Sequence, residues 1–260
     1  MARLTTGSRS VAGKVALVTG AGSGIGRATA HLLADEKALV AVTDVSGDGV
    51  DTVVKEIVSA GGKAKGWVLD VADAAAARQV TEEVAAAFGG LDILVNNAGV
   101  NAIADIVGVR YEDVWTSSME VNLTGQMHLI RACLPLLQQS SEGGRIVNVA
   151  STEGMEATAY NSPYTVSKHG VIGLTRALAV ELGQRNVTVN CVCPGPIRTG
   201  MTAAIPEDDK TKFARRRVPL RRYGNPDEVA HAILSLVLPA ASYINGAILT
   251  VDGGMTAQAT

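Results

Sequence analysis

The chain is poor in aromatic residues and cysteine, and it has no long hydrophobic run. Its 260 residues include three cysteines, Cys133, Cys191 and Cys193. An odd number without metal-ligand spacing is typical of a reducing compartment. No apolar run reaches the ~18 residues that a membrane-spanning helix requires. The polar first ten residues lack the hydrophobic segment of a secretory signal. We therefore expect a cytoplasmic protein without a membrane partner.

The charge of the chain is nearly balanced. Lys and Arg number 23 and Asp and Glu number 25, which gives a net charge of −2 at pH 7. Proteins that bind the phosphate backbone of nucleic acids carry a basic surplus. The four histidines are too dispersed to form a ligand cluster. The composition therefore predicts neither a nucleic-acid partner nor a metal site.

Apolar segments of strand length alternate with segments of helical period. Candidate strands lie at 14–20, 38–43, 64–69, 91–96, 145–150, 187–193 and 247–251, and candidate helices at 24–36, 48–60, 73–88, 111–138, 161–183 and 226–237. This alternation predicts an α/β fold of the Rossmann type, a doubly wound parallel sheet with helices on both faces. Because no repeat or linker divides the chain, we expect one domain over 11–260, after a flexible tail over 1–10.

A glycine-rich turn follows the first candidate strand. The sequence Thr19-Gly-Ala-Gly-Ser-Gly-Ile-Gly26 stands between that strand and a helical pattern that begins near Arg27. Strand, glycine turn and helix form the context of a dinucleotide-binding fingerprint. Glycine lets the backbone approach a pyrophosphate, and the N-terminus of the helix attracts the anion. We predict that this turn holds the phosphates of a dinucleotide cofactor.

An acidic residue ends the second candidate strand. Asp44 lies 18 residues beyond Gly26, near the spacing at which a carboxylate accepts hydrogen bonds from an adenosine ribose. A carboxylate there repels a 2′-phosphate, and Val45, Ser46 and Gly47 offer such a phosphate no basic group. The pattern predicts NAD as the cofactor in preference to NADP.

One tyrosine has a lysine one helical turn away. Of the five tyrosines, only Tyr164 is followed by lysine at the fourth position, Lys168, and Ser151 lies 13 residues before it. Four helical residues make about one turn, so both side chains share a helix face. An ammonium ~4 Å from a phenol can lower its pKa by roughly three units, from ~10 to about 7. General acid–base catalysis is most efficient near that value. We therefore predict that Lys168 prepares Tyr164 for proton transfer.

These sequence motifs, in this order along the chain, resemble those of the classical branch of the short-chain dehydrogenase/reductase family. The likeness extends from Gly13 to Gly254. Besides the glycine turn, Asn96-Asn-Ala-Gly99 resembles the family's NNAG motif, and the segment 194–199 resembles the part that contacts the nicotinamide carboxamide. The pair Asp70-Val71 resembles the pair that flanks the adenine. The resemblance implies these cofactor-binding residues: Gly20, Ser23, Gly24, Ile25, Gly26, Asp44, Asp70, Val71, Asn97, Ala98, Gly99, Tyr164, Lys168, Pro194, Gly195, Ile197 and Thr199.

The resemblance also implies a catalytic set of Asn122, Ser151, Tyr164 and Lys168. Tyr164 is expected to give or take the hydroxyl proton, and Ser151 to hold the substrate oxygen. Lys168 is expected to lower the pKa of Tyr164 and to bind the nicotinamide ribose, and Asn122 to hold a water that links Lys168 to solvent. The hydride moves between the cofactor and the substrate carbon. Because hydroxyl donors polarise the carbonyl, no metal is needed.

The segment 199–225 breaks the alternation of strands and helices. A long irregular insertion in a compact domain is usually functional or disordered, and in the family this region is a mobile substrate lid. Met201, Ile205 and Phe213 are apolar and are expected to close over a substrate. The basic run from Arg215 to Arg222 suits an acidic group, and it also suits a solvated or intersubunit surface.

The resemblance bears on specificity and assembly as well. Specificity is expected to depend on the lid and on residues 101–106 and 152–160. In family members, the helices equivalent to 111–138 and 161–183 pack subunits together. This implies a homotetramer, with a dimer as the alternative.

The leading hypothesis is an NAD(H)-dependent oxidoreductase that interconverts a small-molecule secondary alcohol and a ketone. An alternative is a 3-oxoacyl-[acyl-carrier-protein] reductase. Those reductases mostly use NADPH, which Asp44 disfavours, and they resemble one another in two basic carrier-docking positions, which here are Arg185 and Glu142. An alternative of another class is a non-catalytic dinucleotide-binding or scaffold protein on the same fold. The complete catalytic set favours an enzyme.

Overall fold

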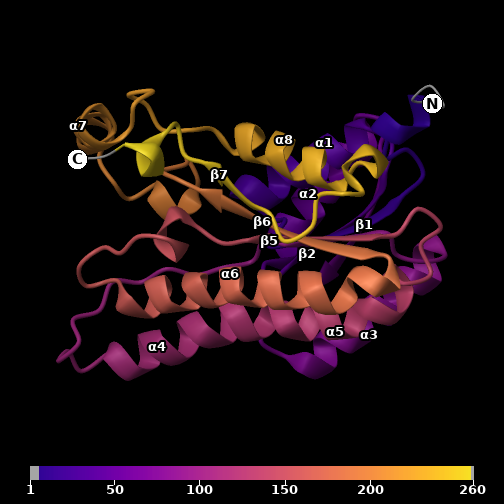
Figure 1. Ribbon diagram of the computed structural model, residues 1–260, viewed down its shortest axis with the longest axis horizontal. Helices are drawn as coiled ribbons and strands as arrows, with labels where there is room; N and C mark the ends of the chain where they lie inside the picture. Colours follow the sequence, from indigo (N-terminus) through magenta and orange to yellow (C-terminus); the bar gives the residue numbers. More distant parts are fainter. Residues whose placement is uncertain (1–5, 259–260) are drawn as a thin grey trace.

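The computed structural model of the protein describes residues 6–258. Within them, seven strands form one parallel sheet in the order β3-β2-β1-β4-β5-β6-β7 (Figure 1). The strands are β1 (Val15–Thr19), β2 (Leu39–Asp44), β3 (Lys63–Val68), β4 (Ile93–Asn96), β5 (Gly144–Val149), β6 (Val187–Pro194) and β7 (Ile248–Val251). Parallel neighbours need long crossover connections, and helices supply them. The predicted doubly wound α/β fold is confirmed.

Helices cover both faces of the sheet. The α-helices are α1 (Gly24–Asp35), α2 (Gly47–Ser59), α3 (Ala74–Phe88), α4 (Tyr111–Met119), α5 (Gly125–Leu137), α6 (Ser162–Leu182), α7 (Glu207–Arg217) and α8 (Pro226–Val237). Helices α1, α2 and α8 pack on one face, and α3, α5 and α6 pack on the other (Figure 1). Among residues 6–258, no helix combines the length and apolarity that a bilayer crossing requires.

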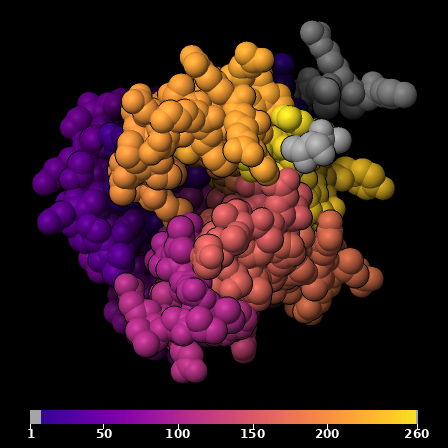
Figure 2. All heavy atoms as spheres, turned by 90° about the vertical axis from the view of Figure 1, so that its left-hand side faces the viewer, coloured from indigo at the N-terminus to yellow at the C-terminus, as the bar shows by residue number. Residues whose placement is uncertain are grey.

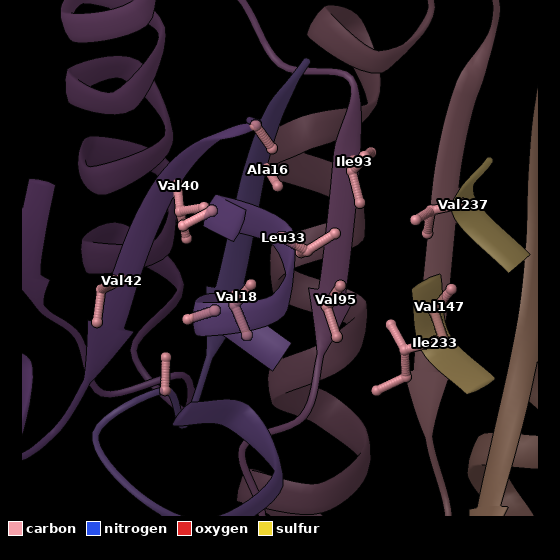
Figure 3. Close-up of a cluster of buried hydrophobic side chains, with 14 of the residues drawn as sticks. Ala16, Val18, Leu33, Val40, Val42, Ile93, Val95, Val147, Ile233 and Val237 are labelled. Carbon is pink, nitrogen blue, oxygen red and sulfur yellow. The ribbon is translucent and has the colours of Figure 1, made fainter. Parts of the chain in front are cut away.

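Successive residues of each strand alternate between two cores. On β1, Ala16 and Val18 belong to the core under α1, α2 and α8, whereas Leu17 belongs to the core under α3, α5 and α6. All five residues of β1 are buried, because helices cover both faces of a parallel sheet. Figure 3 shows Leu33 of α1 and Ile233 of α8 over the strands of the first core. The apolar runs of the sequence thus become central strands.

The motifs of the sequence gather at the carboxyl edge of this sheet. β1 ends at Thr19, β2 at Asp44, β4 at Asn96 and β6 at Pro194. β1 pairs with β2 on one side and with β4 on the other, so the strand order reverses there. Ligands of open α/β sheets bind at this switch point, because the loops on its two sides diverge.

Two segments differ from the prediction. The region 199–225 is not wholly irregular, because it contains α7. This helix has acidic residues in its first turn and basic residues in its last, the order that the helix dipole favours. The predicted flexible tail over 1–10 includes a 3-10 helix at Thr6–Arg9, and residues 1–5 of that tail lie outside the described part of the chain.

Candidate active site

The turn after β1 is fixed to the turn after β4. Thr19 Oγ1 accepts hydrogen bonds from the backbone N–H groups of Asn97 and Ala98, both at 3.0 Å. Asn97 Nδ2 donates to the carbonyl oxygens of Thr19 and Gly20 at 2.9 and 3.1 Å. A Cβ on Gly20 would lie 2.8 Å from Ala98 Cα, and its φ of +61° favours glycine. The two predicted cofactor motifs therefore form one unit. Thr19 opens the glycine-turn motif, but no role for its side chain was predicted from the sequence.

The glycine loop leads directly into the N-terminus of α1. A Cβ on Gly26 would lie 2.1 Å from the carbonyl oxygen of Gly20, so loop and helix touch at this position. The N-cap residue Ser23 makes no side-chain cap hydrogen bond. The first N–H groups of a helix have no intrahelical acceptor, and they carry a partial positive charge. This cradle fits a pyrophosphate.

Asp44 is held beside the glycine loop. Its Oδ2 accepts a hydrogen bond from Gly22 N at 2.9 Å, and its Oδ1 accepts one from Ser46 N at 2.9 Å. Each carboxylate oxygen retains acceptor capacity beyond these bonds. The structure thus fixes a negatively charged acceptor at the position that the sequence predicts for ribose binding.

One cleft, with a volume of about 680 Å³, brings nearly all predicted site residues together. The predicted residues in its lining are Gly20, Ser23, Gly24, Ile25, Asp44, Asp70, Val71, Asn97, Ala98, Gly99, Ser151, Tyr164, Lys168, Pro194, Gly195, Ile197 and Thr199. Gly26 and Asn122 are not in the lining, because Gly26 lies at the packed base of the loop and Asn122 lies behind the NNAG turn. Val100, Val121 and Thr202 line the cleft although no motif contained them.

Ser151, Tyr164 and Lys168 meet on one wall of the cleft. Tyr164 and Lys168 stand one turn apart near the start of α6, where Pro163 occupies the first turn. Lys168 Nζ lies 5.5 Å from the centroid of the Tyr164 ring and donates a hydrogen bond to the carbonyl oxygen of Val149 at 2.9 Å. The Ser151 hydroxyl lies close enough to the Tyr164 hydroxyl to act on its pKa. The predicted trio is therefore assembled as one group.

The pKa of Tyr164 differs from the prediction. Burial raises the pKa of Tyr164 to about 12, and the hydrogen bond with Ser151 acts in the opposite direction. Burial lowers the pKa of Lys168 to about 8. The ammonium lies beside the ring and is bonded to the Val149 carbonyl, so its charge does not offset the loss of water around the phenol. The predicted pKa near 7 is wrong for this structure, in which Tyr164 is a neutral phenol at pH 7.

The predicted helix 111–138 is interrupted at Asn122. Helices α4 and α5 are joined by a π-helical turn over Glu120–Thr124, and Asn122 is its buried residue. Single π-helical turns are rare and occur frequently at functional sites. The extra residue in this turn changes the direction of the side chains relative to a continuous α-helix.

Asn122 uses its whole amide group within the protein. Its Nδ2 donates to the carbonyl oxygen of Val100 at 2.9 Å and to Ser167 Oγ at 3.0 Å, and its Oδ1 accepts from Val100 N at 2.8 Å. A Cβ on Gly99 would lie 3.1 Å from Asn122 Oδ1 and 3.5 Å from Lys168 Nζ. Asn122 therefore supports the NNAG turn directly beside Lys168.

Ion pairs hold the two ends of the lid region. Arg198 pairs with Glu207 at the first residue of α7. Arg222 donates to both carboxylate oxygens of Glu228, at 2.6 and 2.7 Å. The hydrogen bonds from Arg222, together with the backbone N–H of Asn225, lower the pKa of Glu228 to about 2. One member of the predicted basic run thus has a structural partner at the start of α8.

Known proteins resemble the chain over nearly its whole length. The family model described as Enoyl-(Acyl carrier protein) reductase matches residues 20–256. The 3-oxoacyl-[acyl-carrier-protein] reductase FabG of Thermotoga maritima is 42% identical over 94% of this chain and 98% of that protein. The D-threitol dehydrogenase of Mycolicibacterium smegmatis is 38% identical over 94% of this chain and 93% of that protein.

Solved structures share the fold. The crystal structure of levodione reductase has a TM-score of 0.89 and 31% identity, and the match covers 95% of this chain and 99% of that one. A structure assigned as an NAD(P)-dependent gluconate 5-dehydrogenase from Beutenbergia cavernae, with bound NADP, has a TM-score of 0.90 and 40% identity, and the match covers 97% and 100%. Fold, cleft and relatives agree, and the chain belongs to the short-chain dehydrogenase/reductase family.

Proposed function

We propose that the protein is an NAD(H)-dependent oxidoreductase that interconverts a secondary alcohol and a ketone. The observation that carries the proposal is the single cleft, which joins the glycine loop and Asp44 to Ser151, Tyr164 and Lys168. Membership of an oxidoreductase family supports it. A pure dinucleotide-binding protein needs the first half of this cleft and has no use for a buried tyrosine–lysine pair.

The first half of the cleft fits a nicotinamide dinucleotide. The glycine loop and the N-terminus of α1 would hold the pyrophosphate, and Asp44 would accept hydrogen bonds from the adenosine ribose. When bound, the nicotinamide supplies or accepts the hydride and, in its oxidised form, adds a positive charge to the site. A fixed carboxylate at Asp44 repels a 2′-phosphate, and this supports NAD over NADP.

Tyr164 would transfer the proton at the substrate oxygen. As a neutral phenol it donates to the oxygen that gains charge when a ketone is reduced, and the Ser151 hydroxyl donates a second hydrogen bond to that oxygen. The reverse direction requires Tyr164 to lose its proton. Loss of the phenol proton becomes easier as the pH rises, so alcohol oxidation is expected to accelerate in the same direction.

A second candidate is a 3-oxoacyl-[acyl-carrier-protein] reductase, and the 42% identity with FabG favours it. Arg185, in a 3-10 helix after α6, retains one of the two basic docking positions. At the other position, Glu142 forms an ion pair with Lys14 at 2.8 Å. Because position 142 carries a carboxylate, only one of the two carrier-docking positions is basic, and this disfavours the second candidate.

The experiment starts with calorimetric titration of the purified protein with NADH and with NADPH. NAD reduction is then followed with a panel of secondary alcohols at alkaline pH, and a 3-oxoacyl thioester is tested with each reduced cofactor. Tighter binding of NADH with alcohol-dependent NAD reduction supports the proposal. Faster NADPH-dependent turnover of the thioester assigns the second candidate instead. Absence of cofactor binding, or cofactor binding without turnover, rejects the enzymatic assignment.

A further inference from the structure

The part of the cleft beside Tyr164 opens between three segments of the chain. In Figure 2, the lid residues lie across a hollow from the loop that follows β4, and the loop before α6 borders the same hollow. Resting on the proposed function, we infer that the substrate is an uncharged compound with a bulky apolar substituent beside its reacting carbon. Polyols, sugar acids and other anionic substrates are disfavoured.

The charges inside the cleft support this inference first. Among the described residues in its lining, the ionisable side chains besides Tyr164 are Asp44, Asp70 and Lys168. The two carboxylates lie at the ends of β2 and β3, on the cofactor side, and Lys168 Nζ is bonded to the Val149 carbonyl. A substrate carboxylate or phosphate would therefore find no arginine and no unbonded ammonium there. An unpaired charge inside a cleft is strongly disfavoured.

The loops that follow β4 and precede α6 carry carboxylates, and the arginine at the start of the lid is already paired. Arg198 is paired with Glu207, and the carboxylate of Glu153 accepts hydrogen bonds from two threonines. Further carboxylates in these segments, at Asp105 and Glu156, would repel an anion. Electrostatics thus select against acidic substrates inside the cleft and beside these two loops, whereas the basic run of the lid lies outside the cleft lining.

Exposed apolar side chains occur in all three segments that border the hollow, and we term this set the apolar rim. The apolar rim consists of Ile103, Ile106, Met155, Tyr160, Met201 and Phe213. The first two follow β4, the next two precede α6, and the last two belong to the lid. The backbone N–H of Ala104 donates to the carbonyl oxygen of Tyr160 at 2.8 Å, which joins the first two segments. Contiguous exposed apolar surface next to a catalytic group is typical of a ligand-binding groove.

Tyr160 is the aromatic member of this rim, and its backbone is strained. Its φ is +61°, in the left-handed region that bulky residues avoid, and its side chain is 63% exposed. Such strain persists where the surrounding structure imposes it, and it concentrates at ligand clamps. The hydrogen bond from the backbone N–H of Ala104 to the carbonyl oxygen of Tyr160 holds this peptide group in place. The Tyr160 ring is therefore attached to a fixed backbone, four residues before Tyr164.

The test is a substrate series with the complete chain and NAD at alkaline pH. It compares 2-alkanols of increasing length and a phenyl-substituted secondary alcohol with polyols and hydroxy acids of similar size. We expect kcat/KM to rise by up to about fourfold per added methylene, the factor that corresponds to ~0.8 kcal/mol for each buried CH₂. Calorimetric binding of the same alcohols to the NADH complex should have a negative heat-capacity change, the mark of apolar burial.

Two substitutions in the lining test the inference directly. Met201→Gln and Val100→Thr preserve side-chain size and add polarity. Each should lower kcat/KM for the longest alcohol by roughly tenfold, mainly through KM, and should lower it less for the shortest alcohol, which contacts less apolar surface. Val58→Thr, an exposed position on α2, is the matched control and should change neither.

The outcomes are distinguishable. Two results overturn the apolar assignment while the proposed function stands. One is that kcat/KM rises equally with alcohol length in Met201→Gln, Val100→Thr and Val58→Thr. The other is that polyols or hydroxy acids are turned over faster than alkanols. Absence of turnover with every alcohol, in a chain that binds NADH, overturns the proposed function and the inference with it.

Discussion

Asn122 and Val100 exchange two hydrogen bonds. Val100 N donates to Asn122 Oδ1 at 2.8 Å, and Asn122 Nδ2 donates to the carbonyl oxygen of Val100 at 2.9 Å. The amide side chain thus pairs with a backbone as another peptide group would. Because Val100 follows the NNAG turn and lines the cleft, this contact ties the wall of the site to the π-helical turn between α4 and α5.

Loss of this contact should destabilise the fold. Asn122→Ala removes the partner of the N–H and C=O of Val100, at a position with no solvent exposure, and one of the two hydrogen bonds of Ser167 Oγ, which still donates to the carbonyl oxygen of Tyr164. Each of the three lost hydrogen bonds contributes about 0.5–1.5 kcal/mol, so the free energy of unfolding should fall by roughly 2–4 kcal/mol. Urea denaturation measures the change. Ser167→Ala removes only one of these bonds and should cost less, and a loss under about 1 kcal/mol in Asn122→Ala would contradict the assignment.

Tyr164→Phe should separate chemistry from cofactor binding. The substitution keeps the ring and removes the hydroxyl on which Ser151 acts. We expect kcat to fall by at least ~100-fold, the lower range for a lost general acid, while calorimetry finds a nearly unchanged affinity for NADH. Tyr243→Phe, at a fully exposed tyrosine outside the cleft lining, is the control and should retain kcat. Turnover of Tyr164→Phe at the wild-type rate would exclude Tyr164 as the proton donor.

Asp44→Asn should shift the preference between the two cofactors. The amide retains one acceptor and loses the negative charge that opposes a 2′-phosphate. A charge ~4 Å away at an effective dielectric constant of ~20 is worth up to ~4 kcal/mol. Because salt screens part of this repulsion, the ratio of the Kd for NADPH to the Kd for NADH should fall by roughly 10- to 100-fold. Asp48→Asn, exposed in the first turn of α2, should leave the ratio unchanged. An unmoved ratio in Asp44→Asn would show that Asp44 does not select the cofactor.

Lys168 should make the stability of the fold depend on alkaline pH. Its pKa is about 8 in the folded chain against an ordinary value of 10.5. Between these values the unfolded chain holds a proton that the folded chain lacks, so this residue's contribution to stability rises with pH across the window. Below it, the cost of burying the charged ammonium is present in full. Wild type should therefore gain up to about 3 kcal/mol relative to Lys168→Met between the two pKa values.

Urea denaturation of both proteins at several pH values checks this result. The thiols and tyrosines that also titrate there are common to the two proteins, so their effects cancel in the difference. A difference that does not change between pH 8 and pH 10.5 would mean that Lys168 is not buried as a cation at neutral pH.

The location of the site was predictable because it follows from topology. Gly20, Asp44 and Ser151 each stand at or just after the end of an apolar strand, and parallel strands place all their carboxyl ends at one edge. The clamp made by Thr19 was not predictable, because its partners Asn97 and Ala98 lie on another strand's loop. The π-helical turn at Asn122 was missed because α4 and α5 continue one apolar helical pattern across it.

The amino-acid sequence by itself determined the order of strands and helices, the glycine turn, the acid at Asp44 and the helical spacing of Tyr164 and Lys168, since each depends on neighbours along the chain. Only the tertiary structure decided how acidic Tyr164 is, because its pKa depends on how much water the surrounding elements exclude. It also decided the character of the mouth. The apolar rim is assembled from three segments distant in the sequence, and only folding brings them to one opening.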